Sequence, residues 1–212
     1  MPLIDLTHQL TKGMPVFPGS PPTVLDALSD IGSQGYNELQ LHITTHTGTH
    51  IDCGRHLITD SFDTGSASPE RFYGPGWVVD CRDTGGNIPV SLFSDLEKIN
   101  DKPDFVLLLT GWSKYWGDPR YFGKFPVLTP DAAEYLSNIS LKGVGIDAPS
   151  FDPVESESFP VHIKLLSQGF VLIENLTGLE NLPARSFIFS CLPLKIKDGD
   201  GSPVRAVGIV NE

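Results

Sequence analysis

The chain has 212 residues, of which 40% are hydrophobic and 19% charged, a balance typical of a globular protein with an ample core. Its formal net charge of −11 argues against a nucleic-acid surface and against polybasic attachment to a membrane. No apolar run approaches the ~20 residues of a membrane span, and residues 1–5 lack the features of a signal peptide. The three cysteines have no CxxC spacing and fit a reducing compartment. We therefore expect a soluble, cytoplasmic protein.

The first forty residues predict strands joined by a rigid loop. Residues 3–10 alternate loosely and indicate a first strand. The prolines of 14–22 fix an extended loop, in which Phe17 either reaches into a pocket or covers the core. From Asn37 onward, Leu39, Leu41 and Ile43 alternate with polar residues, which predicts a strand that leads directly into the next segment.

The middle of the chain predicts two strands with a helix between them. Residues 72–81 indicate a strand, and Leu92, Leu96 and Ile99 recur at helical spacing behind Pro89, which predicts a helix of about three turns. The continuous apolar run 105–109 is typical of a strand covered on both faces. The aromatic loop 113–125 either lines a pocket for a flat substrate or packs on the surface, and its rings are Tyr115, Trp116, Tyr121 and Phe122.

Thr129 and Pro130 predict the start of a helix that runs to Leu136. Residues 144–147 indicate a short strand, Pro160 and Gly169 delimit a second helix, and 170–173 indicate a buried strand. Two more strands are expected at 186–191 and 204–210.

Glu174 ends a buried apolar run, where an ionised carboxylate needs a cation or hydrogen-bond donors, so Glu174 and the nearby His162 are candidate site residues.

The most informative stretch is 46–56, which places three histidines and a carboxylate within eleven residues. His46, His50, Asp52 and His56 fall at even offsets, so a fully extended strand would direct all of them to one face. Such ionisable side chains in one apolar-flanked segment are costly to bury without a partner, and they are the types that bind divalent metals.

A straight strand cannot bring these side chains to one ion. At roughly 3.3 Å per residue, His46 and His50 would lie about 13 Å apart, whereas each must approach a metal to about 2.1 Å. A helix would separate His50 from Asp52 by about 200°. We therefore expect a bend at Gly48, then an extended segment in which Cys53 points away as a small buried thiol, while His56 folds back beyond Gly54.

The stretch 46–56 resembles the signature His-x-Gly-Thr-His-x-Asp-x-Pro-x-His of the cyclase-like family of metal-dependent hydrolases, which includes bacterial kynurenine formamidase and isatin hydrolase; Gly54 replaces the proline. Supporting segments are similar along the whole chain: 14–19, 110–112, 145–150, 162–176 and 203–206. The resemblance implies one α/β domain over 1–212, of the swivelling β/β/α type, with a mixed sheet or barrel-like β core flanked by short helices. It also implies a homodimer or homotetramer.

Carried over residue by residue, the resemblance makes His46, His50 and Asp52 ligands of one metal ion. Asp52 would bridge to a second ion held by His162 and Glu174. His56 matches the catalytic acid/base, and Phe17 stands where kynurenine formamidases carry a substrate-stacking tryptophan. Two divalent ions are implied, Zn or alternatively Mn.

The resemblance therefore implies a metal-dependent hydrolase of a C–N amide bond, an arylformamidase that converts N-formylkynurenine to kynurenine and formate in tryptophan catabolism, or a close relative of such an enzyme. Opening of a cyclic amide or ester, such as isatin, a lactam or a lactone, is the alternative within the same chemistry. Two readings of another class stay open: an Fe(II) oxygenase built on a 2-His-1-carboxylate set, and a non-catalytic metal or ligand binder. The expected partner is a small-molecule substrate, not nucleic acid or a membrane.

Overall fold

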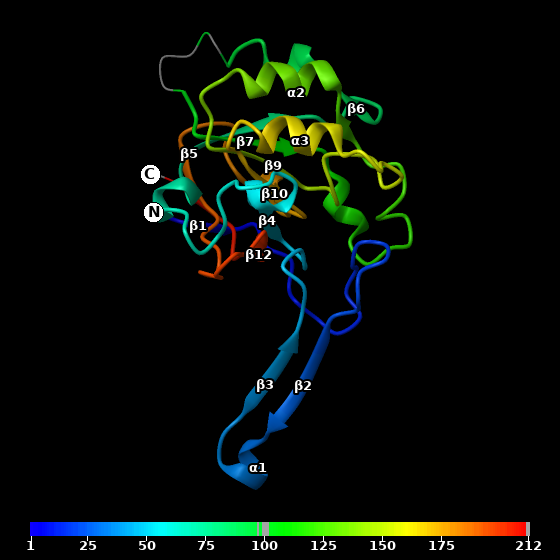
Figure 1. Cartoon of the computed structure of the whole chain (residues 1–212), viewed down its shortest axis with the longest axis vertical. Helices are drawn as coiled ribbons and strands as arrows, with labels where there is room; N and C mark the ends of the chain where they lie inside the picture. The colour runs from blue at the N-terminus through cyan, green and yellow to red at the C-terminus, as the bar shows by residue number, and fades with distance from the viewer. Residues whose placement is uncertain (97, 99–101, 211–212) are drawn as a thin grey trace.

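The computed structural model describes residues 1–96, 98 and 102–210 (Figure 1). In this part of the chain, nine strands form one mixed sheet in the order β1-β13-β11-β5-β7-β9-β10-β4-β12. Its strands are β1 (Leu3–Asp5), β4 (His50–Asp52), β5 (Tyr73–Asp80), β7 (Phe105–Leu109), β9 (Gly143–Ile146), β10 (Val171–Glu174), β11 (Phe187–Ser190), β12 (Gly201–Pro203) and β13 (Val207–Val210). Two small sheets pair β2 (Val24–Ser29) with β3 (Glu38–His42) and β6 (Asn87–Ile88) with β8 (Val127–Leu128). The α-helices are α1 (Ile31–Gln34), α2 (Pro130–Ser137) and α3 (Pro160–Leu166).

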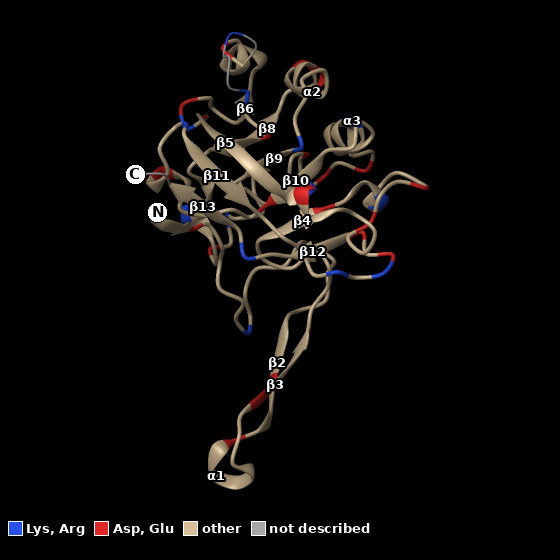
Figure 2. Cartoon of the chain, turned by 90° about the vertical axis from the view of Figure 1, so that its left-hand side faces the viewer, with Lys and Arg blue, Asp and Glu red and all other residues tan. Residues whose placement is uncertain are grey.

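The centre of the large sheet is parallel and covered on both faces. β5, β7, β9 and β10 run parallel to one another, and the antiparallel strands β11 and β4 flank them on the two sides. Along β7, Val106 and Leu108 pack with the helices, while Phe105 and Leu107 point to the opposite core. Figure 2 shows α2 and α3 on the same side of the sheet. The apolar run of β7 is continuous because neither of its faces meets water.

The sheet curls around its second core. Ile51 of β4 and Phe189 of β11 belong to one cluster with Leu107, although four strands lie between β11 and β4 in the sheet order. The rings of Phe105 and Phe189 pack at 5.1 Å. A sheet that closes toward itself in this way forms a half-barrel, which confirms the expected α/β fold with a barrel-like β core and short helices.

Most predicted elements are confirmed, with three differences. The first strand ends at Asp5 instead of residue 10. The prediction of a helix of about three turns from Leu92 to Ile99 is wrong. A 3₁₀ helix spans Val90–Phe93, because the hydrogen bonds Leu92 N to Pro89 O and Leu96 N to Phe93 O join residues three apart. Ile99 lies outside the described residues. The strands β2, β6, β8 and β12 and the short helix α1 were not predicted.

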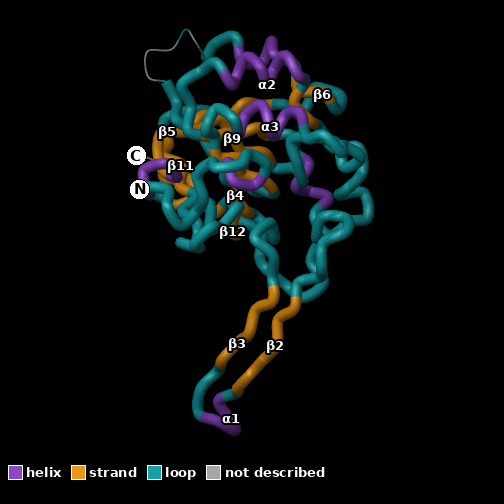
Figure 3. The backbone as a smooth tube through the Cα atoms, in the orientation of Figure 1, coloured by secondary structure: helices purple, strands orange, loops and turns teal. Residues whose placement is uncertain are grey.

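The strand predicted from Asn37 exists as β3, but its apolar side is not covered. β3 pairs with β2 in a hairpin that extends away from the large sheet, with α1 at its tip (Figures 1 and 3). All five residues of β3 are exposed. The alternation of apolar and polar residues predicted the strand correctly, but it could not show whether the apolar face would be buried or exposed to solvent.

The three cysteines are free and buried, so Cys53 is the small buried thiol expected from its position. No helix in the described part of the chain has the length and apolar character that a bilayer crossing requires.

Candidate metal centre

The backbone around β4 has the bend and the alternation predicted for it. Gly48 adopts φ of +65°, a conformation that side chains with a Cβ rarely take. Beyond it β4 is extended, so His50 and Asp52 share a face. Ile51 and Cys53 point to the opposite side, into the core. The bend thus directs two candidate ligands away from the apolar core.

The register of the sheet places Glu174 beside this pair. β10 runs antiparallel to β4 with Glu174 opposite His50, and residues directly opposite each other point to the same face. His50 Nε2 lies 3.4 Å from Asp52 Oδ1 and 3.5 Å from Glu174 Oε2. All three side chains are buried. Two strands far apart in sequence therefore contribute to one cluster.

His162 reaches the same cluster from α3. Asp152 Oδ2 accepts hydrogen bonds from His162 Nδ1 (2.7 Å) and from its backbone N–H (3.0 Å), and Oδ1 accepts from the Val161 N–H (3.1 Å). The ring is thereby fixed with Nε2 3.0 Å from Glu174 Oε1 and 3.6 Å from Asp52 Oδ2. A carboxylate behind the distal nitrogen is the arrangement that orients a metal-binding histidine.

The donor set fits a divalent cation. His50 Nδ1 donates to the Gly48 carbonyl (2.8 Å), so in the neutral ring Nε2 carries a lone pair that faces two carboxylates. Lone pairs and anionic oxygens repel unless a cation lies among them. The described residues that line the adjacent pocket include no Lys or Arg to supply that charge. Imidazole nitrogens with carboxylate oxygens are ligands that Zn²⁺ and Mn²⁺ accept.

The electrostatics of the cluster favour a positive charge. Burial alone would lower the pKa of His162, but hydrogen bonds to Asp152 and Glu174 outweigh it and raise the pKa to about 10. Burial would raise the pKa of Asp52, but His46 and His50 outweigh it and hold that pKa well below its usual range. The same carboxylates would attract a divalent ion, which would bind His162 Nε2 in place of its proton.

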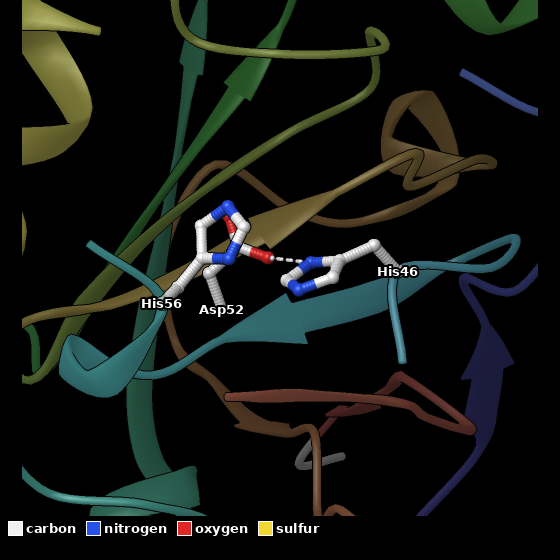
Figure 4. Close-up of side chains that lie close together, drawn as sticks. All are labelled: His46, Asp52 and His56. Carbon is white, nitrogen blue, oxygen red and sulfur yellow. Dashed lines mark hydrogen bonds and ion pairs between the residues drawn. The ribbon is translucent and has the colours of Figure 1, made fainter. Parts of the chain in front are cut away.

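His46 and His56 form a second group around Asp52 (Figure 4). His46 Nδ1 donates to Asp52 Oδ1 (2.7 Å) and Nε2 to Asp200 Oδ2 (2.9 Å), and these two carboxylates outweigh burial and raise the pKa of His46 to about 9. The rings of His46 and His56 are 4.1 Å apart, and His56 Nδ1 lies 3.4 Å from Asp200 Oδ2. The structure therefore brings all six predicted polar site residues into one region.

Asp52 lies where the two groups meet. The ligand atoms of His46, Asp52 and His56 lie within 4.8 Å of one another, and so do those of His50, Asp52 and Glu174. Asp52 Oδ1 lies near both His46 and His50, whereas Oδ2 faces His162, so the two oxygens of this carboxylate are directed to different histidines, as bridging between two ions would require.

Two carboxylates of the site were missed by sequence reasoning. Asp200 contacts both His46 and His56 and comes from the turn before β12, while Asp152 orients His162. The available signals were the Asp-Gly-Asp-Gly run 198–201 before the supporting segment 203–206, and the position of Asp152 just after 145–150. The first signal does not specify partners more than 140 residues away, and the second does not specify that Asp152 bonds to His162.

The cluster opens into a pocket of about 230 Å³ with aromatic walls. Phe17, the predicted substrate residue, lines it and packs edge-on against Phe122 at 6.0 Å. Trp116 and Phe122 also line it, which is the first of the two alternatives for the aromatic loop; Trp116 stacks on His8 at 4.1 Å, and Phe159 adds a fourth ring. Of the other predicted loop aromatics, Tyr121 is fully buried and donates to Asn175 Oδ1.

Gly54, the departure from the family signature, is required by local packing. It begins the 3₁₀ helix Gly54–His56, which turns His56 back toward the site. A Cβ on Gly54 would lie 2.8 Å from Ser61 Cβ and would also collide with Ser61 Oγ. Glycine is therefore the residue that leaves room for Ser61.

Comparisons with known proteins agree with this geometry. The Cyclase family model matches residues 4–153. A kynurenine formamidase of Salinibacter ruber (strain DSM 13855 / M31) is 31% identical over 209 residues, which cover 98% of this chain and 97% of that protein. The structure of isatin hydrolase A from Labrenzia aggregata bound to benzyl benzoate matches with a TM-score of 0.90 at 26% identity, over 100% of this chain and 94% of that one. A structure described as a potential metal-dependent hydrolase with cyclase activity matches with a TM-score of 0.78 at 26% identity, over 100% and 98%. Because the family model covers more than half of the chain and a relative matches nearly its whole length, the chain belongs to the cyclase family.

Proposed function

We propose that the chain is a metal-dependent hydrolase that cleaves the C–N amide bond of an aryl formamide, converting N-formylkynurenine to kynurenine and formate. The observation that carries the proposal is the buried cluster of imidazoles and carboxylates that opens into an aromatic pocket. A relative named kynurenine formamidase, similar over nearly the whole chain, supports this substrate. The relatives reported above are hydrolases by name, which favours this reading over an Fe(II) oxygenase or a non-catalytic binder.

The proposed ligands form two sets that share Asp52. His46 and His50 join Asp52 in the first set, and His162 and Glu174 join it in the second. A divalent ion, Zn or alternatively Mn, supplies Lewis-acid polarisation of a carbonyl and activation of water. Asp152 and the Gly48 carbonyl fix the proton on the distal nitrogens of His162 and His50, so that both Nε2 atoms stay available as ligands.

His56 is the proposed acid/base. It lines the pocket, and Asp200 holds one of its ring nitrogens, so the other is available for proton transfer. His56 takes the proton of the water that attacks the formyl carbon and returns it to the arylamine nitrogen as the C–N bond breaks. The products are formate and a free arylamine, and the imidazole returns to its starting state.

The aromatic pocket walls fit a flat substrate. Phe17 and Phe122 offer ring faces and edges on one side, and Trp116 is held in place by its stack on His8. A planar aryl ring is bound by such walls through stacking and burial. Phe17 stands where kynurenine formamidases carry a substrate-stacking tryptophan and can supply the same kind of contact over a smaller area.

The test is release of free arylamine from N-formylkynurenine by protein reconstituted with Zn or Mn, beside a chelated control. We expect metal-dependent turnover with kcat/KM of about 10⁴ M⁻¹s⁻¹ or more. A metal-loaded protein without turnover would refute the formamidase assignment.

Ring opening of isatin is the second candidate, favoured by the TM-score of 0.90 to isatin hydrolase A over the whole chain. Both substrates present an amide carbonyl on an aromatic frame, and one pocket of this size and lining accommodates either. The same metal-loaded protein assayed with isatin decides between them by the ratio of the two kcat/KM values.

A further inference from the structure

Gly48 provides the carbonyl that orients His50, and this carbonyl is itself held by a side chain. Gly48 lies at the bend before β4 with φ of +65°, and glycine is the residue whose backbone is least restricted. Its carbonyl oxygen accepts hydrogen bonds from His50 Nδ1 (2.8 Å) and from Asn175 Nδ2 (3.0 Å). The second bond fixes the direction of the carbonyl, and therefore the acceptor that holds the imidazole of His50.

Asn175 is anchored through its backbone beside the metal centre. It follows Glu174 at the end of β10 and adopts φ of +56°, a left-handed conformation that asparagine tolerates better than most residues. Its backbone N–H donates to the Ala148 carbonyl (3.0 Å), and its carbonyl accepts from Thr49 Oγ1 (2.6 Å). Because Asn175 is buried, its side-chain amide must find its partners within the protein.

The hydroxyl of Tyr121 is the second partner of this amide. Tyr121 is fully buried, and its hydroxyl lies 2.6 Å from Asn175 Oδ1. The Gly48 carbonyl can only accept a hydrogen bond, so the amide must present Nδ2 to Gly48 and Oδ1 to Tyr121. The opposite orientation would place two oxygen atoms against each other at Gly48. The tyrosine therefore stabilises the orientation of the amide that holds the carbonyl.

The same tyrosine supports the aromatic side of the pocket. Its ring packs edge-on against Trp116 at 5.1 Å and against Phe122 at 5.3 Å, and both of these side chains line the pocket. Its backbone carbonyl accepts from Trp112 Nε1 (2.9 Å), which fixes the loop at this point. Since Tyr121 has no exposed surface, it acts on the site only through its neighbours.

We propose that Tyr121 and Asn175 are positioning residues of the metal centre, which hold the Gly48 carbonyl and through it orient His50 toward a cation. The inference rests on the proposed function, because it takes His50 as a ligand of a divalent ion. Three hydrogen bonds, of 2.6, 3.0 and 2.8 Å, lead from the Tyr121 hydroxyl to His50 Nδ1. They fix both the tautomer of the ring and the direction of its Nε2, which is what the outer partners of a metal-binding histidine supply.

Positioning describes the role of Asn175 better than contact with the substrate does. Asn175 lines the pocket, but its amide oxygen and its amide nitrogen are both engaged within the protein. A substrate that used either atom would have to compete with Tyr121 or with the Gly48 carbonyl. The amide therefore serves the ligand side of the pocket, while Tyr121 joins that side to the aromatic wall.

The test is the affinity of the protein for Zn²⁺, measured by competition with a chromophoric chelator on variants whose fold is verified by circular dichroism. Asn175→Gly removes the amide and keeps a residue that adopts the left-handed conformation without strain. We expect it to weaken Zn²⁺ binding by about 10–100-fold, as for other groups that orient a metal-binding histidine. Tyr121→Phe removes only the hydroxyl and acts through one further group, so we expect a smaller loss of about threefold to tenfold.

The double variant shows whether the two residues act through each other. If the hydroxyl acts only through the amide, Tyr121→Phe causes no further loss of Zn²⁺ affinity in the Asn175→Gly protein, whereas independent effects would add. Tyr115→Phe is the matched control, because it makes the same change in the same loop at a ring that packs on Trp112 at 4.8 Å. It should bind Zn²⁺ as the wild type does.

Urea unfolding in excess EDTA separates positioning from a purely structural role. A structural role lowers the stability of the metal-free protein and leaves the Zn²⁺ dissociation constant of the folded variants unchanged, whereas positioning raises that constant. If Asn175→Gly fails to fold, Tyr121→Phe and its control carry the test. Wild-type affinity in either folded variant, or fully additive losses in the double variant, would overturn this inference alone. A wild-type protein that binds no Zn²⁺ would overturn the proposed metal centre with it.

Discussion

Replacement of Asp152 by asparagine tests the arrangement of the metal centre without altering a proposed ligand. Asp152 accepts three hydrogen bonds, from His162 Nδ1, from the His162 backbone N–H and from the Val161 backbone N–H. Asparagine has the same shape but only one acceptor oxygen. In either orientation of the amide, His162 loses its carboxylate partner and one N–H at the start of α3 loses its acceptor.

The expected loss follows from the role of the carboxylate. Removal of a group that orients a metal-binding histidine costs about 10–100-fold in metal affinity, equivalent to about 1.4–2.7 kcal/mol. The lost backbone hydrogen bond costs a further ~1 kcal/mol of folding stability, which is present with or without metal. The two effects are separable because only the first depends on the cation.

The assay is competition for Zn²⁺ between the protein and a chromophoric chelator, together with urea unfolding in excess EDTA. Glu157→Gln, at an exposed carboxylate of the segment before α3, is the matched control and should bind metal as the wild type does. Wild-type metal affinity in a folded Asp152→Asn protein would refute the assignment of His162 as a ligand oriented by Asp152.

Three further predictions concern the acid/base, a packing constraint and pH. His56→Ala should keep its metal and lose most turnover, whereas Asp52→Ala should lose metal as well; equal metal loss in both, measured by elemental analysis, would make His56 a ligand. Gly54→Ala should lower the free energy of unfolding by about 1–3 kcal/mol through the collision with Ser61, and adding Ser61→Gly should restore part of it; an unaffected urea midpoint in the single variant would contradict the packing argument. Burial lowers the pKa of His8 to about 4, below the 6.5 of the unfolded chain, so the unfolded state binds the extra proton and stability falls as pH drops from 6.5 to 4. Because the ring is only partly buried, we expect a loss of about 2 kcal/mol in chelated protein, and His8→Phe, which keeps the stack on Trp116, should remove this pH dependence.

The sequence by itself determined the local features of the fold and of the site. The bend at Gly48 and the shared face of His50 and Asp52 follow from residue spacing, because backbone geometry over a few residues leaves few alternatives. The buried strand β7 follows equally from its apolar run, and the start of α2 from Thr129 and Pro130. The prediction of a helix over 92–99 was wrong because Ser91, Ser94 and Asp95 favour tight turns over a continuous helix. The spacing of the apolar residues carries no information about this preference.

Only the tertiary structure decided which distant residues share the site and which surfaces stay uncovered. Asp152 and Asp200 lie beside His162 and His56 because sheet register and the path of the loops bring them there, and a single carboxylate leaves no periodic signal in the sequence. The apolar alternation of β3 is the same whether its face meets a core or solvent, so its exposure on the hairpin of β2 and β3 could not be predicted. Local geometry is fixed by neighbours along the chain, whereas ligand sets and interfaces depend on how the elements pack.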